Sequence, residues 1–141
     1  MKIRYVFVIS LFVFIFASCT TINSYVNLTK DDNPSFYIFI DEDYLNLAVI
    51  IQEEISKRGY KVIITFNKNI EKNDRSKNVL VYLNYIYHHN LVRYSLRTLR
   101  IEFIDALSGD MIGNGFYEGS NSRGADGITR TVINQMLDKI R

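Results

Sequence analysis

The chain has 141 residues with a single cysteine, and 48% of the residues are hydrophobic, which is typical of a globular protein. One cysteine excludes an intramolecular disulfide, and this length makes one domain that can bury a core without such a cross-link. The formal net charge is +2, but Lys2 and Arg4 account for that surplus and both lie near the start. The remaining chain is formally neutral, so its charge gives no case for binding nucleic acid or anionic lipid.

The beginning of the chain has the pattern of an export signal. A basic start with Lys2 and Arg4 is followed by a nearly uniformly apolar stretch over residues 5–16 and then by two small residues. The apolar stretch is about a dozen residues long, whereas a helix that spans a bilayer needs about 20. The pattern therefore predicts a signal peptide over residues 1–18 rather than a permanent membrane-spanning helix.

The end of this segment, Phe16-Ala17-Ser18-Cys19, resembles the lipobox of bacterial lipoproteins, in which Leu usually stands at the place of Phe16. The resemblance implies cleavage before Cys19, diacylation of its thiol and acylation of its new amino group. Several acyl chains anchor a protein firmly, whereas one alone binds only marginally. Thr20 rather than Asp follows the cysteine, which by the same resemblance favours the outer membrane, facing the periplasm. The alternative is an ordinary cleavage site with an incidental cysteine.

The stretch after the signal is polar and has no clear periodicity. We expect residues 19–35 to hold the lipidated cysteine and a flexible tether that keeps the domain off the membrane. A single globular domain is expected over residues 36–141. Ten tyrosines and nine phenylalanines, with abundant Ile and Val, favour strands in this domain.

The first part of the domain predicts a strand–helix–strand unit. An apolar run over residues 36–40 is bounded by turn formers and indicates a buried central strand. The carboxylates at 41–43 suit the positive end of a helix, and one of them can cap it. Apolar residues then recur at helical spacing up to Ile55, and Gly59 ends the helix. With a strand over 61–66, the unit predicts parallel pairing through a right-handed crossover.

Three more strands are expected in the second half of the domain. Residues 79–88 alternate, with the more apolar side chains at odd positions. The next strand, 92–105, also alternates, but its pattern slips near Arg97, which indicates a bulge. A hairpin turn with a positive φ at Gly109 leads to a return strand over 111–117.

The last segment predicts a second amphipathic helix that Asp126 or a neighbour caps. Its apolar stripe contains Ile128, Val132, Ile133, Met136, Leu137 and Ile140. The predicted fold class is therefore α+β: a mixed five-stranded sheet in the order β-α-β-β-β-β-α, with two helices on one face. The other face is expected to carry alternating Tyr, Arg, Asn and Glu side chains.

Three segments of the domain carry a resemblance to a known group of proteins. They are the helix end at 57–62, the strand at 78–85 and the hairpin at 103–115. Together they look like small uncharacterised bacterial envelope lipoproteins whose domain is related to the curli-secretion lipoprotein type. The resemblance implies a mixed sheet covered by helices and a role in the envelope, and it carries over no catalytic residues.

Three features of the sequence are candidates for a ligand site. His88 and His89 are adjacent on a strand and point to opposite faces, so they do not suit one metal ion. The carboxylates at 41–43 lack the spacing of a calcium loop, and the start of a helix explains them more simply. Residues 119–124 have the glycine spacing of a phosphate loop, but Ala125-Asp126 stands where Lys-Ser/Thr is required. We therefore predict no metal site and no cofactor besides the lipid on Cys19.

The sequence indicates a non-catalytic protein. It has no Gly-x-Ser-x-Gly motif, and lipidation would consume its only thiol. The arginines interleaved with Tyr94 resemble a nucleic-acid surface, but export and neutrality favour a solvated strand face, and no nucleic-acid partner is expected.

The predicted function is a membrane-anchored lipoprotein of the cell envelope that serves as a binding or assembly module. Its partner is an envelope protein complex or its own copies. Its partner surface is the open sheet face, with Tyr82, Asn84, Arg100 and Glu102, because Tyr and Arg are favoured at interfaces. The alternatives are an enzyme acting on envelope polymers, which needs converging carboxylates in a cleft, and a carrier of lipid or small hydrophobes, which needs a cavity between helices and sheet.

Overall fold

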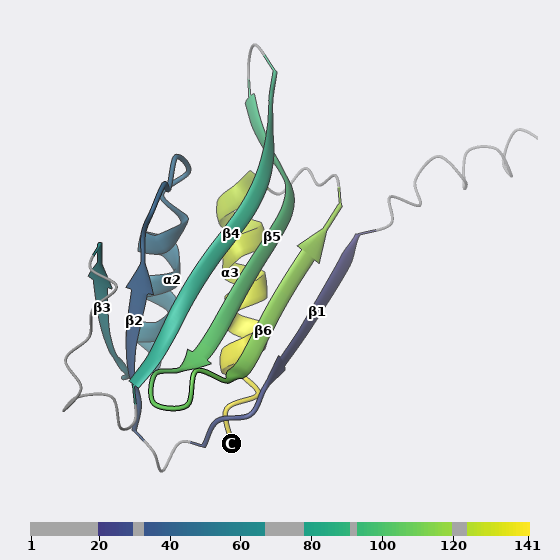
Figure 1. Ribbon diagram of the computed structural model, residues 1–141. Helices are drawn as coiled ribbons and strands as arrows, with labels where there is room; N and C mark the ends of the chain where they lie inside the picture. The colour runs from purple at the N-terminus through teal and green to yellow at the C-terminus, as the bar shows by residue number, and fades with distance from the viewer. Residues whose placement is uncertain (1–19, 30–32, 67–77, 91–92, 120–123) are drawn as a thin grey trace, which may run out of the picture.

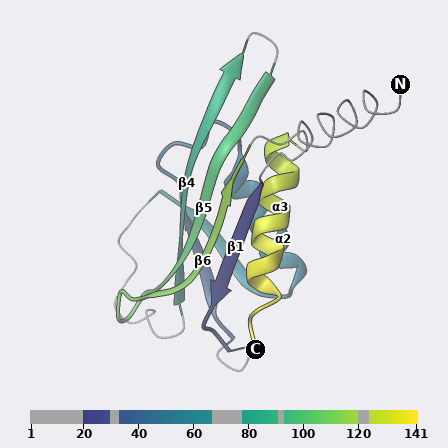
Figure 2. The same ribbon diagram turned by 90° about the vertical axis from the view of Figure 1, so that its right-hand side faces the viewer.

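The computed structural model describes residues 20–29, 33–66, 78–90, 93–119 and 124–141. These residues form one mixed sheet with both helices packed on the same face, as Figure 1 and Figure 2 show. The elements in chain order are β1 (Thr21–Val26), β2 (Ser35–Phe39), α2 (Leu47–Lys57), β3 (Lys61–Thr65), β4 (Asn78–Asn90), β5 (Arg93–Asp105), β6 (Met111–Glu118) and α3 (Gly124–Leu137).

The sheet has six strands in the order β1-β6-β5-β4-β2-β3. β2 is parallel to both β3 and β4, and the other neighbouring pairs are antiparallel. The predicted α+β class and the parallel strand–helix–strand unit are confirmed. The predicted number of five strands is wrong, because β1 adds an edge strand.

β1 lies in the segment that we expected to be a flexible tether. It pairs with β6 from Thr21 opposite Glu118 to Val26 opposite Gly113, so residues 21–26 belong to the sheet. Only its even-numbered side chains turn towards the helices, and they are half-buried, while its odd-numbered side chains are exposed. An edge strand that buries so little carries a weak hydrophobic signal, so its polar sequence predicts a tether instead of a strand.

Local details of the prediction also agree with the structure. Ile86 pairs with Thr98 and Tyr87 pairs with Leu96, so Arg97 forms the predicted bulge. Gly109 has a φ of 80°, as its hairpin turn requires. Asp43 caps α2, because its carboxylate oxygens accept hydrogen bonds from the main-chain N–H groups at 47 and 48, at 3.0 and 2.8 Å.

The core lies between the sheet and the helices. It is built from alternate side chains of β2, β4 and β5 and from the apolar stripes of α2 and α3. α3 packs especially close to β6 at Gly115, where an added Cβ would lie 2.5 Å from Met136 Sδ and 2.7 Å from Val132 Cγ1. A glycine at this position therefore lets the helix approach the strand.

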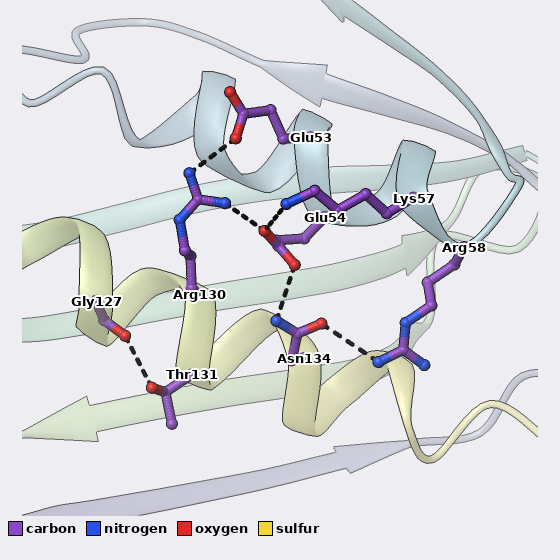
Figure 3. A network of polar contacts seen from close by, with 8 residues as sticks. All are labelled: Glu53, Glu54, Lys57, Arg58, Gly127, Arg130, Thr131 and Asn134. Carbon is purple, nitrogen blue, oxygen red and sulfur yellow. Dashed lines mark hydrogen bonds and ion pairs between the residues drawn. The ribbon is translucent and has the colours of Figure 1, made fainter.

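A polar network joins the two helices, as Figure 3 shows. The Glu54 side chain of α2 is 9% exposed. Its carboxylate accepts hydrogen bonds from Lys57 Nζ at 2.7 Å, from Asn134 Nδ2 at 2.9 Å and from Arg130. Arg130 also donates to Glu53 at 2.8 Å. A carboxylate that is this buried and fully hydrogen-bonded holds α2 and α3 in one arrangement.

Replacing the glycine at the helix–sheet contact tests the close packing. We expect Gly115→Ala to lower the free energy of unfolding by about 1–3 kcal/mol, since the new methyl group overlaps Val132 and Met136. Gly113→Ala is the matched variant on the same strand, where the added Cβ would lie 3.1 Å from the nearest atom. It should lower the free energy of unfolding by less than Gly115→Ala does. Urea unfolding of both variants measures the difference. A Gly115→Ala protein as stable as the wild type would contradict the packing.

The Glu54 network predicts a loss of stability in acid. Hydrogen bonds from Lys57 and Asn134 lower the pKa of Glu54 from 4.5 to about 2. A carboxyl group with a lowered pKa in the folded state stabilises the protein fully above its unfolded pKa, and this stabilisation is lost as the pH falls through the folded value. We expect Glu54→Gln to destabilise the protein by about 2 kcal/mol at neutral pH.

Glu54→Gln should also lose less stability than the wild type between about pH 5 and about pH 2. The exposed neighbour Glu53, which binds the same Arg130, supplies the control variant Glu53→Gln, and its pH profile should follow the wild type. Urea midpoints measured across this pH range give the result. Parallel pH profiles for the wild type and Glu54→Gln would show that the network does not act as described.

Candidate interaction surface

The four predicted surface residues lie together on the sheet face away from the helices. Odd positions such as Val81 and Leu99 are buried beneath the helices, so the even positions of β4, and those of β5 from Thr98 onwards, point to the other side. In the antiparallel register, Tyr82 lies opposite Glu102 and Asn84 lies opposite Arg100. We call this side of the sheet, which neither α2 nor α3 covers, the open face (Figure 1, Figure 2).

The centre of the open face is polar and carries both charges. Arg100 Nη1 lies 3.7 Å from Glu102 Oε1, and the guanidinium carbon lies 5.6 Å from the ring centroid of Phe116 on β6. The side chains of Arg100 and Glu102 are 54% and 27% exposed. An ion pair this exposed contributes little to folding stability, so its groups are available to a partner. Asn114 lies opposite Glu102, and its Oδ1 has no hydrogen-bond partner among the described residues.

An apolar row that the sequence analysis missed borders this centre. Ile63 lies opposite Tyr37, Tyr37 opposite Leu80, and Leu80 opposite Ile104, across four neighbouring strands. All four side chains are half-buried. The apolar run at 36–40 predicts a buried central strand, whereas its odd-numbered side chains point to the open face. A continuous apolar run does not show which face of its strand is left without a covering helix.

A small hollow lies where β2 ends. It is lined by Phe39, Ile40, Asp41, Glu42, Asp43, Tyr82 and Leu83 and has a volume of about 160 Å³. Phe39 stacks on Tyr82, with ring centroids 5.3 Å apart. Ligand sites usually enclose about 300–1,000 Å³, so this hollow is small.

Two carboxylates of this hollow already have hydrogen-bond partners. Besides capping α2, Asp43 accepts a hydrogen bond from the Tyr85 hydroxyl at 3.1 Å. Burial is the main cause of the raised pKa of Tyr85, so the hydroxyl stays protonated and donates. Glu42 accepts from the Tyr44 hydroxyl at 3.2 Å. Asp43 serves the N-terminus of α2 as predicted, but the helix begins only at Leu47 and its N-cap residue is Asn46, so the acidic run lies before the helix.

The histidine pair lies on an arm that β4 and β5 form beyond the rest of the sheet (Figure 1). His89 stacks on Tyr94 with ring centroids 4.4 Å apart, and Tyr94 lies 5.5 Å from Tyr87. His88 and His89 are both exposed. Across the parts of the chain that the structure describes, no three His, Cys, Asp or Glu residues are grouped to hold a metal ion.

The remaining predicted features lie wholly or partly outside the described residues. Cys19 and the signal segment 1–18 are among them, as are residues 120–123 of the glycine loop. Gly124, the last residue of that loop, begins α3 with a φ of 75°. None of the helices in the described ranges is long and apolar enough to cross a membrane.

Comparisons with known proteins give a likeness of fold. A scan against protein-family models finds no match, and a search of curated proteins finds none. Among solved structures, the chain is similar to the PelC dodecamer from Paraburkholderia phytofirmans, in a crystal of space group P6, with a TM-score of 0.58 at 13% identity over 87% of this chain and 99% of that chain.

A point variant of the same dodecamer, in space group C2, also has a TM-score of 0.58. Its identity is 14% over 86% of this chain and 97% of that chain. At this level of identity, the likeness concerns the fold alone. The resemblance to curli-secretion lipoproteins stays a prediction.

Proposed function

We propose that this chain is a bacterial envelope lipoprotein that works without catalysis as a binding and assembly module. A lipid on Cys19 would hold it in the outer membrane, facing the periplasm. The observation that carries the proposal is the open face, because both helices lie on one side and leave a sheet face with aromatic, apolar and charged side chains. A sheet face of this composition fits a protein partner.

The open face has the features of a protein interface. Its polar centre combines Arg100, Tyr82 and Phe116, residue types that are enriched where proteins bind one another. The half-buried apolar row from Ile63 to Ile104 adds surface whose burial favours association. The Arg100–Glu102 pair offers charges of both signs, which orient a partner and give specificity.

The partner in this proposal is an envelope protein complex or further copies of the chain. The similar PelC structures are dodecamers, which supports self-association of a chain with this fold. Closed homo-oligomers are the usual form of such association.

The alternative of an enzyme acting on envelope polymers would use the hollow at the end of β2. Its carboxylates are consecutive, and Asp43 is held by α2 and Tyr85. Paired catalytic carboxylates of glycosidases flank the bond that breaks, at about 5–9.5 Å from each other. The small volume of this hollow and the structural use of Asp43 favour the binding module over the enzyme.

Swapping the charges of the open face tests the partner surface. We expect the double variant Arg100→Glu with Glu102→Arg to reduce the partner recovered from crosslinked membranes by on the order of tenfold, because the pair persists but presents inverted polarity. The measurement is in-cell crosslinking followed by affinity recovery of the tagged, full-length protein.

A matched pair on the helix side supplies the control for this swap. Arg58 and Asp138 lie 2.6 Å apart and are also exposed, so Arg58→Glu with Asp138→Arg changes charge equally without touching the open face. Recovery should stay at the wild-type level in this control. Undiminished recovery after the Arg100–Glu102 swap would remove the open face as the partner surface.

Lipidation is tested by metabolic labelling. Cells that produce the full chain and receive radioactive palmitate should yield a labelled protein in the membrane fraction, because the Cys19 thiol and amino group take up acyl chains. Cys19→Ser should abolish the label and release the protein from membranes. An unlabelled wild-type protein would show that the signal is an ordinary cleavage site.

A further inference from the structure

The two edges of the sheet differ in how they are protected. At the β1 edge, the main-chain N–H of Asn27 donates to Ile112 O, so the odd-numbered residues of β1 face β6 and the even-numbered residues face outwards. Lys139 Nζ donates to the outward carbonyl of Ser24. Arg141 N donates to Leu28 O just beyond the strand, at 3.1 Å. Lys139 and Arg141 therefore cover part of the β1 edge, a usual protection against edge-to-edge pairing.

The β3 edge carries no such cover within the described ranges. Ile40 N donates to Thr65 O at 3.2 Å, so the odd-numbered residues of β3 face β2. The main-chain donors and acceptors of Val62 and Ile64 consequently point away from the sheet. Both of these side chains and Ile63 are apolar, β-branched and half-buried. The middle of this edge, residues 62–64, carries no charge and is a template for pairing with another strand.

We propose that β3 pairs antiparallel with β3 of a second copy, around a two-fold axis at Ile63. This inference rests on the proposed function in that it names one surface through which copies assemble, and it is separate from the open face. In this register, Val62 of one copy faces Ile64 of the other, and their outward main-chain groups exchange hydrogen bonds. A two-fold contact is self-complementary, since each copy supplies the same patch.

The register at Ile63 also covers an exposed aromatic side chain. Phe66 is 79% exposed, the highest value among the large hydrophobic side chains of the described residues. In this register, Phe66 faces Tyr60 of the second copy. Both side chains lie on the helix side of the sheet. Tyr60 already packs edge-on against Phe36, with centroids 5.4 Å apart. Cross-strand aromatic pairs stabilise sheets, so the contact removes the exposed ring from water.

Charge complementarity selects the antiparallel direction. Lys61 stands at the start of β3, whereas the acidic residues Asp41 and Glu42 follow the end of β2, next to the end of β3. Antiparallel pairing brings Lys61 of each copy towards the acidic end of the other. Parallel pairing would instead place the two lysines side by side. The axis stands perpendicular to the sheet, so both open faces lie on the same side of the dimer.

A charge at the axis tests the edge contact. In Ile63→Lys, the two new lysines would face each other across the axis and repel. We expect the dissociation constant of the dimer to rise at least about tenfold. Native mass spectrometry of the full lipoprotein in detergent measures this constant. Asn23→Lys is the matched control, because Asn23 also lies on the open face of an edge strand, at β1. Its dimer should match that of the wild type, and circular dichroism should show that both variants are folded.

A cysteine at the same position gives a positive test. Residues that face each other in a non-hydrogen-bonded antiparallel pair have Cα atoms about 4.5 Å apart, within the range of a disulfide. In the oxidising periplasm, Ile63→Cys should form a covalent dimer and Asn23→Cys should not, with the wild type as the background for Cys19. Three results would each overturn the β3 contact: a monomeric wild type, no covalent dimer of Ile63→Cys, and an Ile63→Lys oligomer as stable as that of the wild type. The last result would leave the proposed function standing, because assembly would persist through another surface.

Discussion

The close packing of α3 against Gly115 is the contact on which the rest of the structure depends. With no side chain at this position, Val132 and Met136 reach the strand, and α3 lies across β1, β5 and β6. The buried carboxylate of Glu54 then joins α2 to α3. Because the apolar stripes of α2 and α3 are both used on this one side, no helix of the described residues covers the other side. The open face is therefore a consequence of how the helices are packed.

Periodicity predicted the elements that bury one complete side. Alternation at 79–88 and 92–105 correctly placed Tyr82 and Arg100 opposite the helices, and helical spacing located α2 and α3. β1 was missed because an edge strand buries only half of its side chains, and these only partly. The apolar row and the β3 edge could not be predicted, since strand order depends on pairing between segments far apart in sequence. The partner role of the four surface residues stays a prediction, because it depends on the molecule that binds to them.

In the proposed module, the β1 edge, the β3 edge and the open face have different roles. Thr21 begins β1, so an anchor on Cys19 would hold the sheet by its β1 edge with almost no tether. Lys139 and Arg141 cover part of that edge. The β3 edge lies at the far side of the sheet, where a second copy can add its strand. Because edge pairing leaves the open face uncovered, one dimer would present two such faces side by side to an envelope partner.

The most direct test of the account is site-specific photo-crosslinking in living cells. A photoreactive amino acid at Asn84 samples the open face, and one at Gln135 samples an exposed position on α3. The account predicts a discrete crosslinked species of defined mass from Asn84 and none from Gln135. Crosslinks from Gln135 with none from Asn84 would contradict it, because the protein would then bind its partner through the helices.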